Sequence, residues 1–224
     1  IRVCKLGNST AETVSELSAT QQAYMTIRQM ILTGVLPPDE KLKIESLRGT
    51  LGIGASPIRE ALSLLTSDQL VERQDQRGFR TAATSPENFQ EILALRCSLE
   101  EMALRQSIDL KNDAWEEELV LAHHKMTRTS RDDVEVFEAI HKEFHMTLVG
   151  NCKSPVLMRF CSQLYDLNIR YRYIAGKSKG YTGRKVGDEH LQILNIAIEG
   201  NAEVACALLK THYQKTGAFL ISRL

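Results

Sequence analysis

The chain has 224 residues, equal numbers of basic and acidic side chains, and the ordinary composition of a globular protein. No apolar run is long enough to span a membrane, the first residues lack the apolar core of an export signal, and the balanced charge excludes a global positive field that would attract nucleic acid. The five cysteines are scattered and form no C-x-x-C pair, so we expect a cytoplasmic protein without a disulfide framework.

The first element predicted is a helix that begins with Thr20 as its N-cap and ends at Gly34, with apolar residues at helical spacing between them. Residues 1–19 are polar and aperiodic, which predicts a mobile N-terminal arm. The stretch VLPPDEKL is predicted to be a turn. A second, short helix then carries Ile44 and Leu47 on its apolar face.

A third helix follows the break GIGAS, with Ser56 as its predicted cap and Pro57 suited to its first position. The stretch LVERQDQRGFRTAA then predicts two short strands around a polar turn that contains glycine. The order helix, helix, turn, helix, hairpin over residues 20–84 predicts a winged helix-turn-helix. In that fold the second helix of the pair enters the major groove of double-stranded DNA.

The second half of the chain, residues 85–224, has a different character. It predicts an amphipathic helix in SPENFQEILALRCSLEEMALRQSI and no convincing strand. Further helices are predicted near 112–128, 132–150, 154–173, 186–199 and 202–222. We therefore expect an all-α bundle of six or seven helices, joined to the winged helix at AATSP.

The stretch LGIGASPIREALSLLTSDQLVERQDQRGFRTA resembles the winged helix of the GntR family of bacterial transcription regulators. The resemblance implies that Pro57 starts the recognition helix and that Arg59, in its first turn, reaches a base edge or a phosphate. Ser56 could touch a phosphate through its hydroxyl. Arg77 and Gly78 are placed at the tip of the wing, where basic residues meet the DNA backbone.

This chain departs from the family pattern where the family usually has Ser-Arg, because Gly54 and Ala55 stand there instead. One expected DNA-contacting arginine is thereby lost. Residues 1–83 hold ten Lys or Arg and nine Asp or Glu, so the domain is barely basic. We expect weak, salt-sensitive binding by a monomer, which a homodimer on two half-sites would strengthen. The alternative is a winged helix used only for protein contacts.

The stretch HKEFH places His141 and His145 four residues apart, on one face of a predicted helix and along the edge of its apolar stripe. His190 and His212 lie on the apolar faces of two later helices. Three helices therefore direct imidazoles toward a shared interior, which indicates a metal site as the alternative to hydrogen-bonded core histidines. The adjacent histidines at 123 and 124 point in different directions and are predicted to lie at the surface or rim.

A GntR winged helix followed by such a bundle resembles the FadR-type subgroup with an FCD effector domain. The matching stretches are HKEFH, DEHLQILNIAIEGNAEVA and LLKTHY. The resemblance implies one divalent transition metal per chain, held by His141, His145, His190 and His212. His141 stands where the family usually has aspartate. An all-histidine set removes the anionic ligand, so zinc or nickel is expected, together with an anionic effector in the open coordination sites.

Two further residues match positions of that domain. Arg96, in LRCSLE, matches an arginine that can form a two-pronged contact with the carboxylate of an effector, although a salt bridge with Glu100 is the alternative. Asn151 matches an asparagine that follows the metal-binding helix, and it could instead cap that helix.

The function expected from these patterns is that of a ligand-responsive transcription regulator, most simply a repressor. A small organic acid bound at the metal would alter its affinity for operator DNA. The alternatives are a metal sensor and, less favoured, a metalloenzyme fused to a DNA-binding module. Enzyme activity is not expected, because Glu143, the one acid within HKEFH, faces away from the metal and no other catalytic motif is present.

Overall fold

The computed structural model describes residues 17–75, 77–176 and 186–223. It divides into two compact units, and the main division follows Ala82. Most of the predicted N-terminal arm, residues 1–19, and most of the glycine-rich break at 175–183 lie outside the described residues. No helix that the structure describes is both long and apolar enough to cross a membrane.

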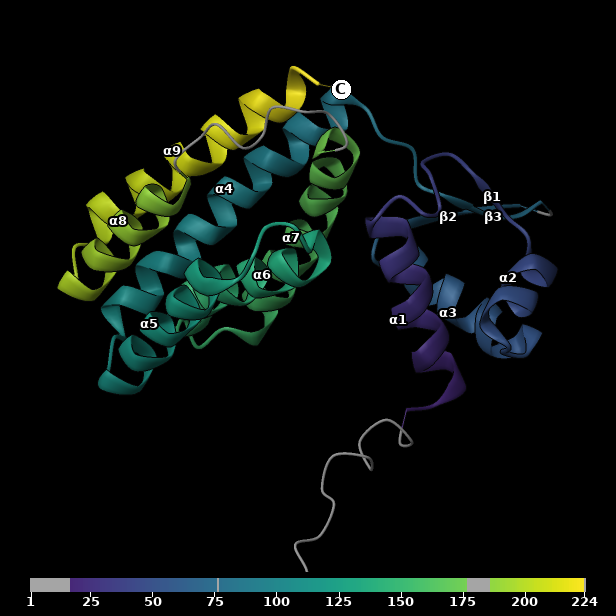
Figure 1. Ribbon diagram of the computed structural model, residues 1–224, viewed down its shortest axis with the longest axis horizontal. Coiled ribbons are helices and arrows are strands. Elements are labelled where there is room, and N and C mark those ends of the chain that lie inside the picture. The colour runs from purple at the N-terminus through teal and green to yellow at the C-terminus, as the bar shows by residue number, and fades with distance from the viewer. Residues whose placement is uncertain (1–16, 76, 177–185, 224) are drawn as a thin grey trace, which may run out of the picture. The chain divides into compact units, whose positions relative to one another are not determined.

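The first unit is a winged helix-turn-helix, as predicted (Figure 1). Most of its buried apolar residues come from the first and third helices, and these include Ile27, Ile31, Ile58, Leu62 and Leu65. The elements are α1 (Ala19–Leu32), β1 (Lys41–Leu42), α2 (Ile44–Leu51), α3 (Ala55–Ser67), β2 (Val71–Gln74) and β3 (Gly78–Thr81).

The wing has three antiparallel strands in the order β1-β3-β2, not the two predicted. The third strand, β1, lies within VLPPDEKL, which we predicted to be only a turn. Leu42 pairs with Phe79 across β1 and β3, and the backbone N–H of Glu40 donates to the hydroxyl of Thr81 at 2.8 Å. Two residues are too few to show the alternation that identifies a strand in a sequence.

The N-termini of two helices also differ from the prediction. α1 begins at Ala19, and Ser18 Oγ accepts a hydrogen bond from the backbone N–H of Gln21 at 3.2 Å, so Ser18 takes the capping role assigned to Thr20. α3 begins at Ala55 with Gly54 as its N-cap and without a side-chain cap. Ser56 and Pro57 are therefore the second and third helical residues, where a missing N–H costs no hydrogen bond.

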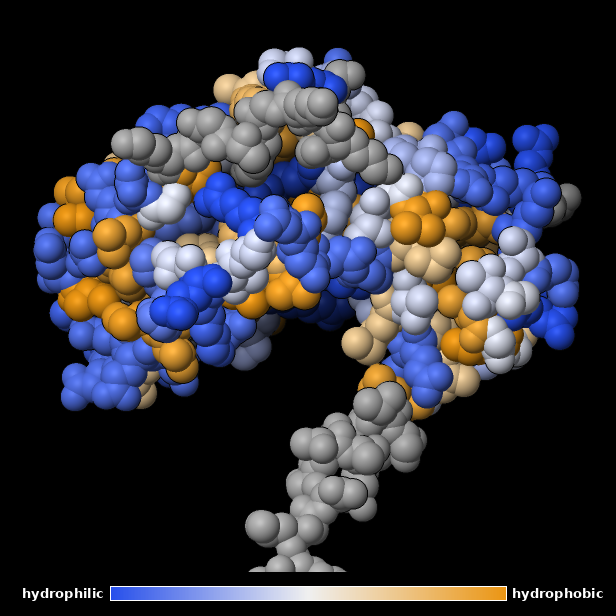
Figure 2. All heavy atoms as spheres, in the orientation of Figure 1, coloured by the Kyte–Doolittle hydropathy of each residue, from blue (hydrophilic) through white to orange (hydrophobic). Residues whose placement is uncertain are grey.

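The second unit is an all-helical bundle, as predicted, and its described residues form six helices. α4 packs against α9, α7 and α6, and α5 packs against α6 and α8 (Figure 1). On the face that Figure 2 shows, hydrophobic residues are interspersed among hydrophilic ones in this unit. The helices are α4 (Pro86–Asp109), α5 (Asp113–Arg128), α6 (Val134–Gly150), α7 (Pro155–Gly176), α8 (Val186–Glu199) and α9 (Ala202–Ile221).

α4 runs through the bundle and carries two charged residues on its buried stripe. Ser85 caps the helix, accepting from the backbone N–H of Asn88 at 3.1 Å, and Pro86 opens it. The buried positions recur at helical spacing, and Arg96 and Glu100 fall among them. α9 lies close to α4 at Gly217, where an added Cβ would overlap the side chain of Leu93. The close approach of the two helices thus depends on glycine at this position.

Candidate metal centre and DNA-binding surface

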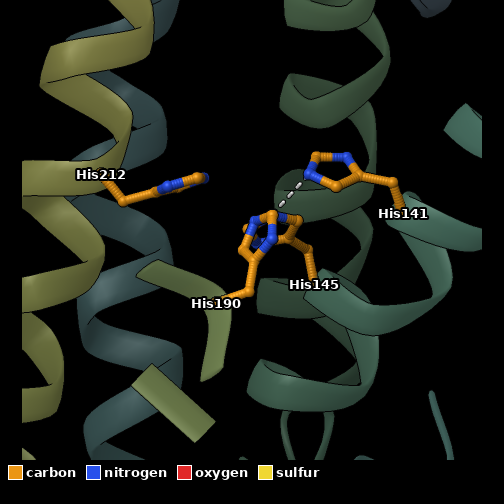
Figure 3. A group of neighbouring side chains, drawn as sticks. All are labelled: His141, His145, His190 and His212. Carbon is orange, nitrogen blue, oxygen red and sulfur yellow. Dashed lines mark hydrogen bonds between the residues drawn. The ribbon is translucent and has the colours of Figure 1, made fainter. Parts of the chain in front are cut away.

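Four buried histidines meet in the interior of the helical unit. His141 and His145 come from α6, His190 from α8 and His212 from α9, and their rings converge (Figure 3). Each side chain offers one nitrogen, and these four nitrogens lie within 4.8 Å of one another. None of the four residues is more than 4% exposed. The helical spacing correctly predicted this cluster.

Three histidines of this cluster, His141, His145 and His190, favour the neutral form. Burial, and then the neighbouring Arg172 guanidinium, lower the pKa of His141 well below its usual value. Burial and the adjacent imidazole of His190 lower the pKa of His145 well below the usual range, and burial does the same for the pKa of His190. Neutral imidazole is the form that coordinates a metal.

The hydrogen bonds of two histidines leave their Nε2 lone pairs directed inward. The hydroxyl of Tyr213 donates to the Glu100 carboxylate, so its oxygen accepts from Nδ1–H of His145 at 2.9 Å. His212 Nδ1–H donates to Glu189 at 2.8 Å. In both residues the proton is fixed on Nδ1, which is the arrangement found when a hydrogen-bond acceptor orients a metal-binding imidazole.

His141 is bonded differently. Its Nδ1 lies 3.1 Å from Nη1 of Arg172, which can only donate, and 2.6 Å from the hydroxyl of Tyr165. The proton of His141 is therefore on Nε2, which faces Nε2 of His145 at 3.2 Å (Figure 3). Metal coordination by Nε2 requires this proton to move to Nδ1. Oε2 of Glu138 is buried, has no hydrogen bond among the described residues and lies 3.5 Å from Nδ1 of His141. It could then accept a hydrogen bond from the Nδ1–H group.

The donor set of the cluster fits a transition metal. Nε2 of His190 is buried and has no hydrogen-bond partner in the described part of the chain, so this polar atom is left unsatisfied. A bound ion would satisfy it. Four imidazoles without a carboxylate suit zinc, nickel or copper better than magnesium or manganese.

A small cavity of about 10 Å³, partly open to solvent, adjoins two of these histidines. Arg96 lies in its lining and is only 4% exposed. Its Nε donates to Glu100 at 2.6 Å and its Nη1 donates to Asn168 at 3.1 Å. The predicted salt bridge with Glu100 therefore exists. The Nη2 of Arg96 is buried and has no hydrogen-bond partner among the described residues, so its N–H groups remain available to a ligand. Burial disfavours the charged guanidinium, but Glu100 together with Tyr213 and Tyr165 outweighs burial and raises the pKa of Arg96.

Three residues around the cavity were not predicted from the sequence. Arg172 and Asn168 line it from α7, and Tyr213 lines it from α9. Asn168 and Arg172 are one helical turn apart and are largely buried. Two polar residues at that spacing among apolar neighbours were the one pattern in the sequence that could have indicated a polar site on α7. Tyr213 had no signal beyond being next to His212.

Asn151 does not line this cavity. It follows α6, and its Nδ2 donates to the carbonyl oxygens of Ser107 at 3.1 Å and Leu110 at 2.6 Å. Its amide is thus engaged with carbonyls at the C-terminal end of α4, which leaves the predicted contact with an effector without structural support.

The remaining histidines and Glu143 lie outside the cluster. Glu143 is exposed and pairs with Lys125 at 2.9 Å, so it cannot act as a base at the centre. His124 is exposed. His123 is half-buried beside Phe144, with their ring centroids 5.6 Å apart, which places it at the rim as expected.

The exposed face of α3 carries the residues predicted to contact DNA. Ser56 and Arg59 are exposed in its first turns, while Pro57 is half-buried. Within the described residues no ion pair or side-chain hydrogen bond holds Arg59, so its guanidinium can extend from the helix. The buried side of α3, formed by Ile58 and Leu62 among others, fixes this face outward.

The tip of the wing lies between β2 and β3. Arg77 is exposed there, and its backbone N–H donates to the carbonyl of Gln74 at 3.0 Å, which closes the turn. Gly78 begins β3 with φ of 92°, a conformation that residues with a Cβ rarely adopt. The glycine therefore sets the direction in which the Arg77 backbone leaves the sheet.

Comparison with known proteins agrees with these two units. Residues 19–80 match the family described as bacterial regulatory proteins, gntR family, and residues 91–215 match the FCD domain. The matches define the class as DNA-binding transcription regulators, not enzymes. The chain belongs to the GntR family and carries a C-terminal FCD domain.

Two curated relatives and one solved structure illustrate the similarity. The HTH-type transcriptional regulator BphR of Paraburkholderia xenovorans is 34% identical over 207 residues, covering 89% of this chain and 84% of BphR. The HTH-type transcriptional repressor GlaR of Escherichia coli is 29% identical over 174 residues, covering 75% and 79%. The structure of E. coli McbR/YncC has a TM-score of 0.80 at 20% identity, covering 92% and 98%, and shares the fold.

Proposed function

We propose that this protein is a transcription regulator, most simply a repressor, whose binding to operator DNA is altered by a small carboxylate held at a metal in the FCD domain. The observation that carries the proposal is the buried set of four histidines beside a cavity that contains a guanidinium with an unsatisfied nitrogen. In this assignment residues 20–84 bind DNA, residues 85–224 bind metal and effector, and the protein acts in the bacterial cytoplasm as a homodimer.

The metal is one zinc or nickel ion per chain, held by His141, His145, His190 and His212. Tetrahedral zinc has Zn–N bonds of about 2.0–2.1 Å, which brings the ligand nitrogens closer together than the 4.8 Å limit of this cluster. A small inward movement of the rings is therefore sufficient. When bound, the ion would supply positive charge and, by taking a further ligand beyond the four imidazoles, a position for an acidic ligand.

The carboxylate of the effector is bound by Arg96, whose Nη2 has no hydrogen-bond partner among the described residues. A charge-assisted hydrogen bond to that nitrogen is strong in a buried site. The DNA is contacted by Arg59 and Ser56 in the first turns of α3, which Pro57 helps to shape, and by Arg77 at the wing beside Gly78.

The test combines metal analysis with DNA binding. Purified protein should hold about one zinc or nickel per chain, and a chelator-treated sample should lose stabilisation by organic acids in a thermal-shift screen. The stabilising acid should change affinity for a promoter fragment only when metal is bound. Protein that never binds a transition metal, together with His145→Ala that melts at the same temperature with or without zinc, would remove the metal from the proposal.

A metal sensor is the second candidate, because four imidazoles can close a tetrahedral site without leaving a position for a ligand. In that case zinc or nickel alone should change the affinity for DNA, and acids should have no additional effect.

A further inference from the structure

A fifth histidine, His123, lies on α5, the helix that packs against α6 and α8. Its ring is half-buried, but its Nε2 atom is buried and has no hydrogen-bond partner among the described residues. Burial, and then the adjacent His124, lower the pKa of His123, so its imidazole favours the neutral form. His123 therefore offers a free nitrogen in the form that coordinates a metal.

The side chain of Phe144 connects His123 with the cluster of four histidines. Its ring is fully buried on α6 and lies edge-on to His123, with the ring centroids 5.6 Å apart. The same ring lies edge-on to His190 at 5.3 Å and to His145 at 5.4 Å. Burial is the main cause that lowers the pKa of His190, and the charge of His123 contributes, so these two residues are close. One phenyl ring thus packs against the fifth histidine and two of the proposed ligands.

His123 and His190 share an unusual property. Nε2 of each is buried and has no hydrogen-bond partner in the described part of the chain, which is costly for a polar atom. His190 is only 1% exposed, whereas His123 reaches the surface. His123 is not one of the four residues whose nitrogens lie within 4.8 Å of one another, so it is not a ligand of the completed centre.

A centre this deeply buried raises the question of how an ion reaches it. No ligand is more than 4% exposed, and removing a charged ion from water in one step is costly. The cavity beside the cluster is only about 10 Å³, room for about one water. Arg96 and Arg172 in its lining are positively charged and can only donate hydrogen bonds, so this cavity does not suit the entry of a cation.

We propose that His123 is an entry ligand, which binds the incoming divalent metal at the rim of the bundle and transfers it to His190 past the side chain of Phe144. This inference rests on the proposed metal centre, and it assigns His123 to the rate of binding and not to the final coordination. Each exchange replaces water on the ion with a neutral imidazole, so the ion is never left without ligands. Rotation of the buried Phe144 ring opens the way between the two histidines.

The test follows zinc uptake and release by stopped-flow mixing. Metal-free full-length protein is mixed with zinc on a weaker coloured chelator, and the colour change gives the uptake rate. Transfer of zinc from loaded protein to an excess of a stronger chelator gives the release rate. His123→Gln should slow uptake by about ten-fold, which lies within the range by which association rates differ among variants of one binding site. Release should slow by the same factor, and the affinity for zinc should not change, because the final ligands are intact.

Two further variants separate coordination from packing. His124→Gln removes the neighbouring, exposed histidine and should leave both rates unchanged. His123→Cys supplies a different ligand at the same position and should restore much of the uptake rate that His123→Gln loses.

Three results would overturn the entry ligand: equal rates in wild type and His123→Gln, a lower affinity of His123→Gln with an unchanged uptake rate, or uptake as slow in His123→Cys as in His123→Gln. Wild-type protein that takes up no zinc at all would instead overturn the metal centre of the proposed function, and the entry ligand with it.

Discussion

Tyr213 holds two buried groups in place at once. Its hydroxyl donates to Glu100 and accepts from His145, and burial raises the pKa of Tyr213 well above its usual value, so it remains a neutral donor. Tyr213→Phe should lower the affinity for zinc by about 10- to 100-fold, because His145 loses the acceptor that orients it. Competition with a coloured chelator measures this. Tyr173→Phe, at a half-buried tyrosine on α7, is the control and should retain wild-type affinity.

Helical spacing predicted that the four histidines lie on buried faces of their helices, whereas Arg96 was predicted from the resemblance to the FCD domain. It did not predict which side chains complete the centre. Glu189, Tyr213 and Arg172 reach it from α8, α9 and α7, and their contacts depend on how those helices pack. Packing order is not encoded in the periodicity of any single helix. The effector-binding role of Asn151 came from the family resemblance and stays a prediction.

At the scale of elements, Asn151 joins the end of α6 to the end of α4. Asn151→Ala leaves the carbonyls of Ser107 and Leu110 without this donor, which should lower the free energy of unfolding by about 1–3 kcal/mol. Urea denaturation measures it, with exposed Asn195→Ala on α8 as the matched control. Acid and metal affinities should be unchanged. Loss of acid binding at wild-type stability would instead restore the effector contact.

The exposed face of α3 carries the prediction for DNA. Arg59→Ala should weaken binding to the promoter fragment by about 1–3 kcal/mol, because the contact made by one guanidinium at a base edge is lost. Fluorescence anisotropy with labelled DNA measures the change. Arg105→Ala removes an exposed arginine from α4, in the other unit, and should have no effect. Equal affinities of the two variants would mean that α3 does not face the DNA.

Helices were easier to predict than strands in this chain. The bundle helices have clear apolar stripes and capping residues, such as Ser85 before α4 and Asn201 before α9, so their limits could be placed closely. The strand β1 is only two residues long and is defined by its pairing with β3, a partner nearly 40 residues away in the chain. The start of α3 was misplaced because Gly54 caps it without a side chain.

At the scale of the whole molecule, the buried histidines make stability depend on pH. Burial lowers the pKa of His141, His145 and His190, whereas the unfolded chain takes up protons near the ordinary pKa of about 6.5. The unfolded state binds more protons below that pH. The free energy of unfolding of metal-free protein is therefore highest above about pH 6.5 and falls as the pH drops, by up to about 1.4 kcal/mol per pH unit for each histidine that stays neutral.

Urea unfolding of chelator-treated protein between pH 7.5 and 5.5 measures this slope. His124→Gln, at an exposed position, should leave the slope unchanged. A flat profile across this range would show that the cluster takes up protons without unfolding.

Hydrogen bonds join Arg96 to Glu100, Glu100 to Tyr213, and Tyr213 to His145. They form one continuous path between the proposed acid site and the metal ligands. Thermodynamic reciprocity then requires that an acid bound more tightly in the presence of zinc also makes zinc bind more tightly, by the same factor. The protein would respond to the coincidence of two small solutes: at low free zinc, a rise in the acid would itself recruit the metal. Promoter activity would then follow the product of the two concentrations, and neither one alone.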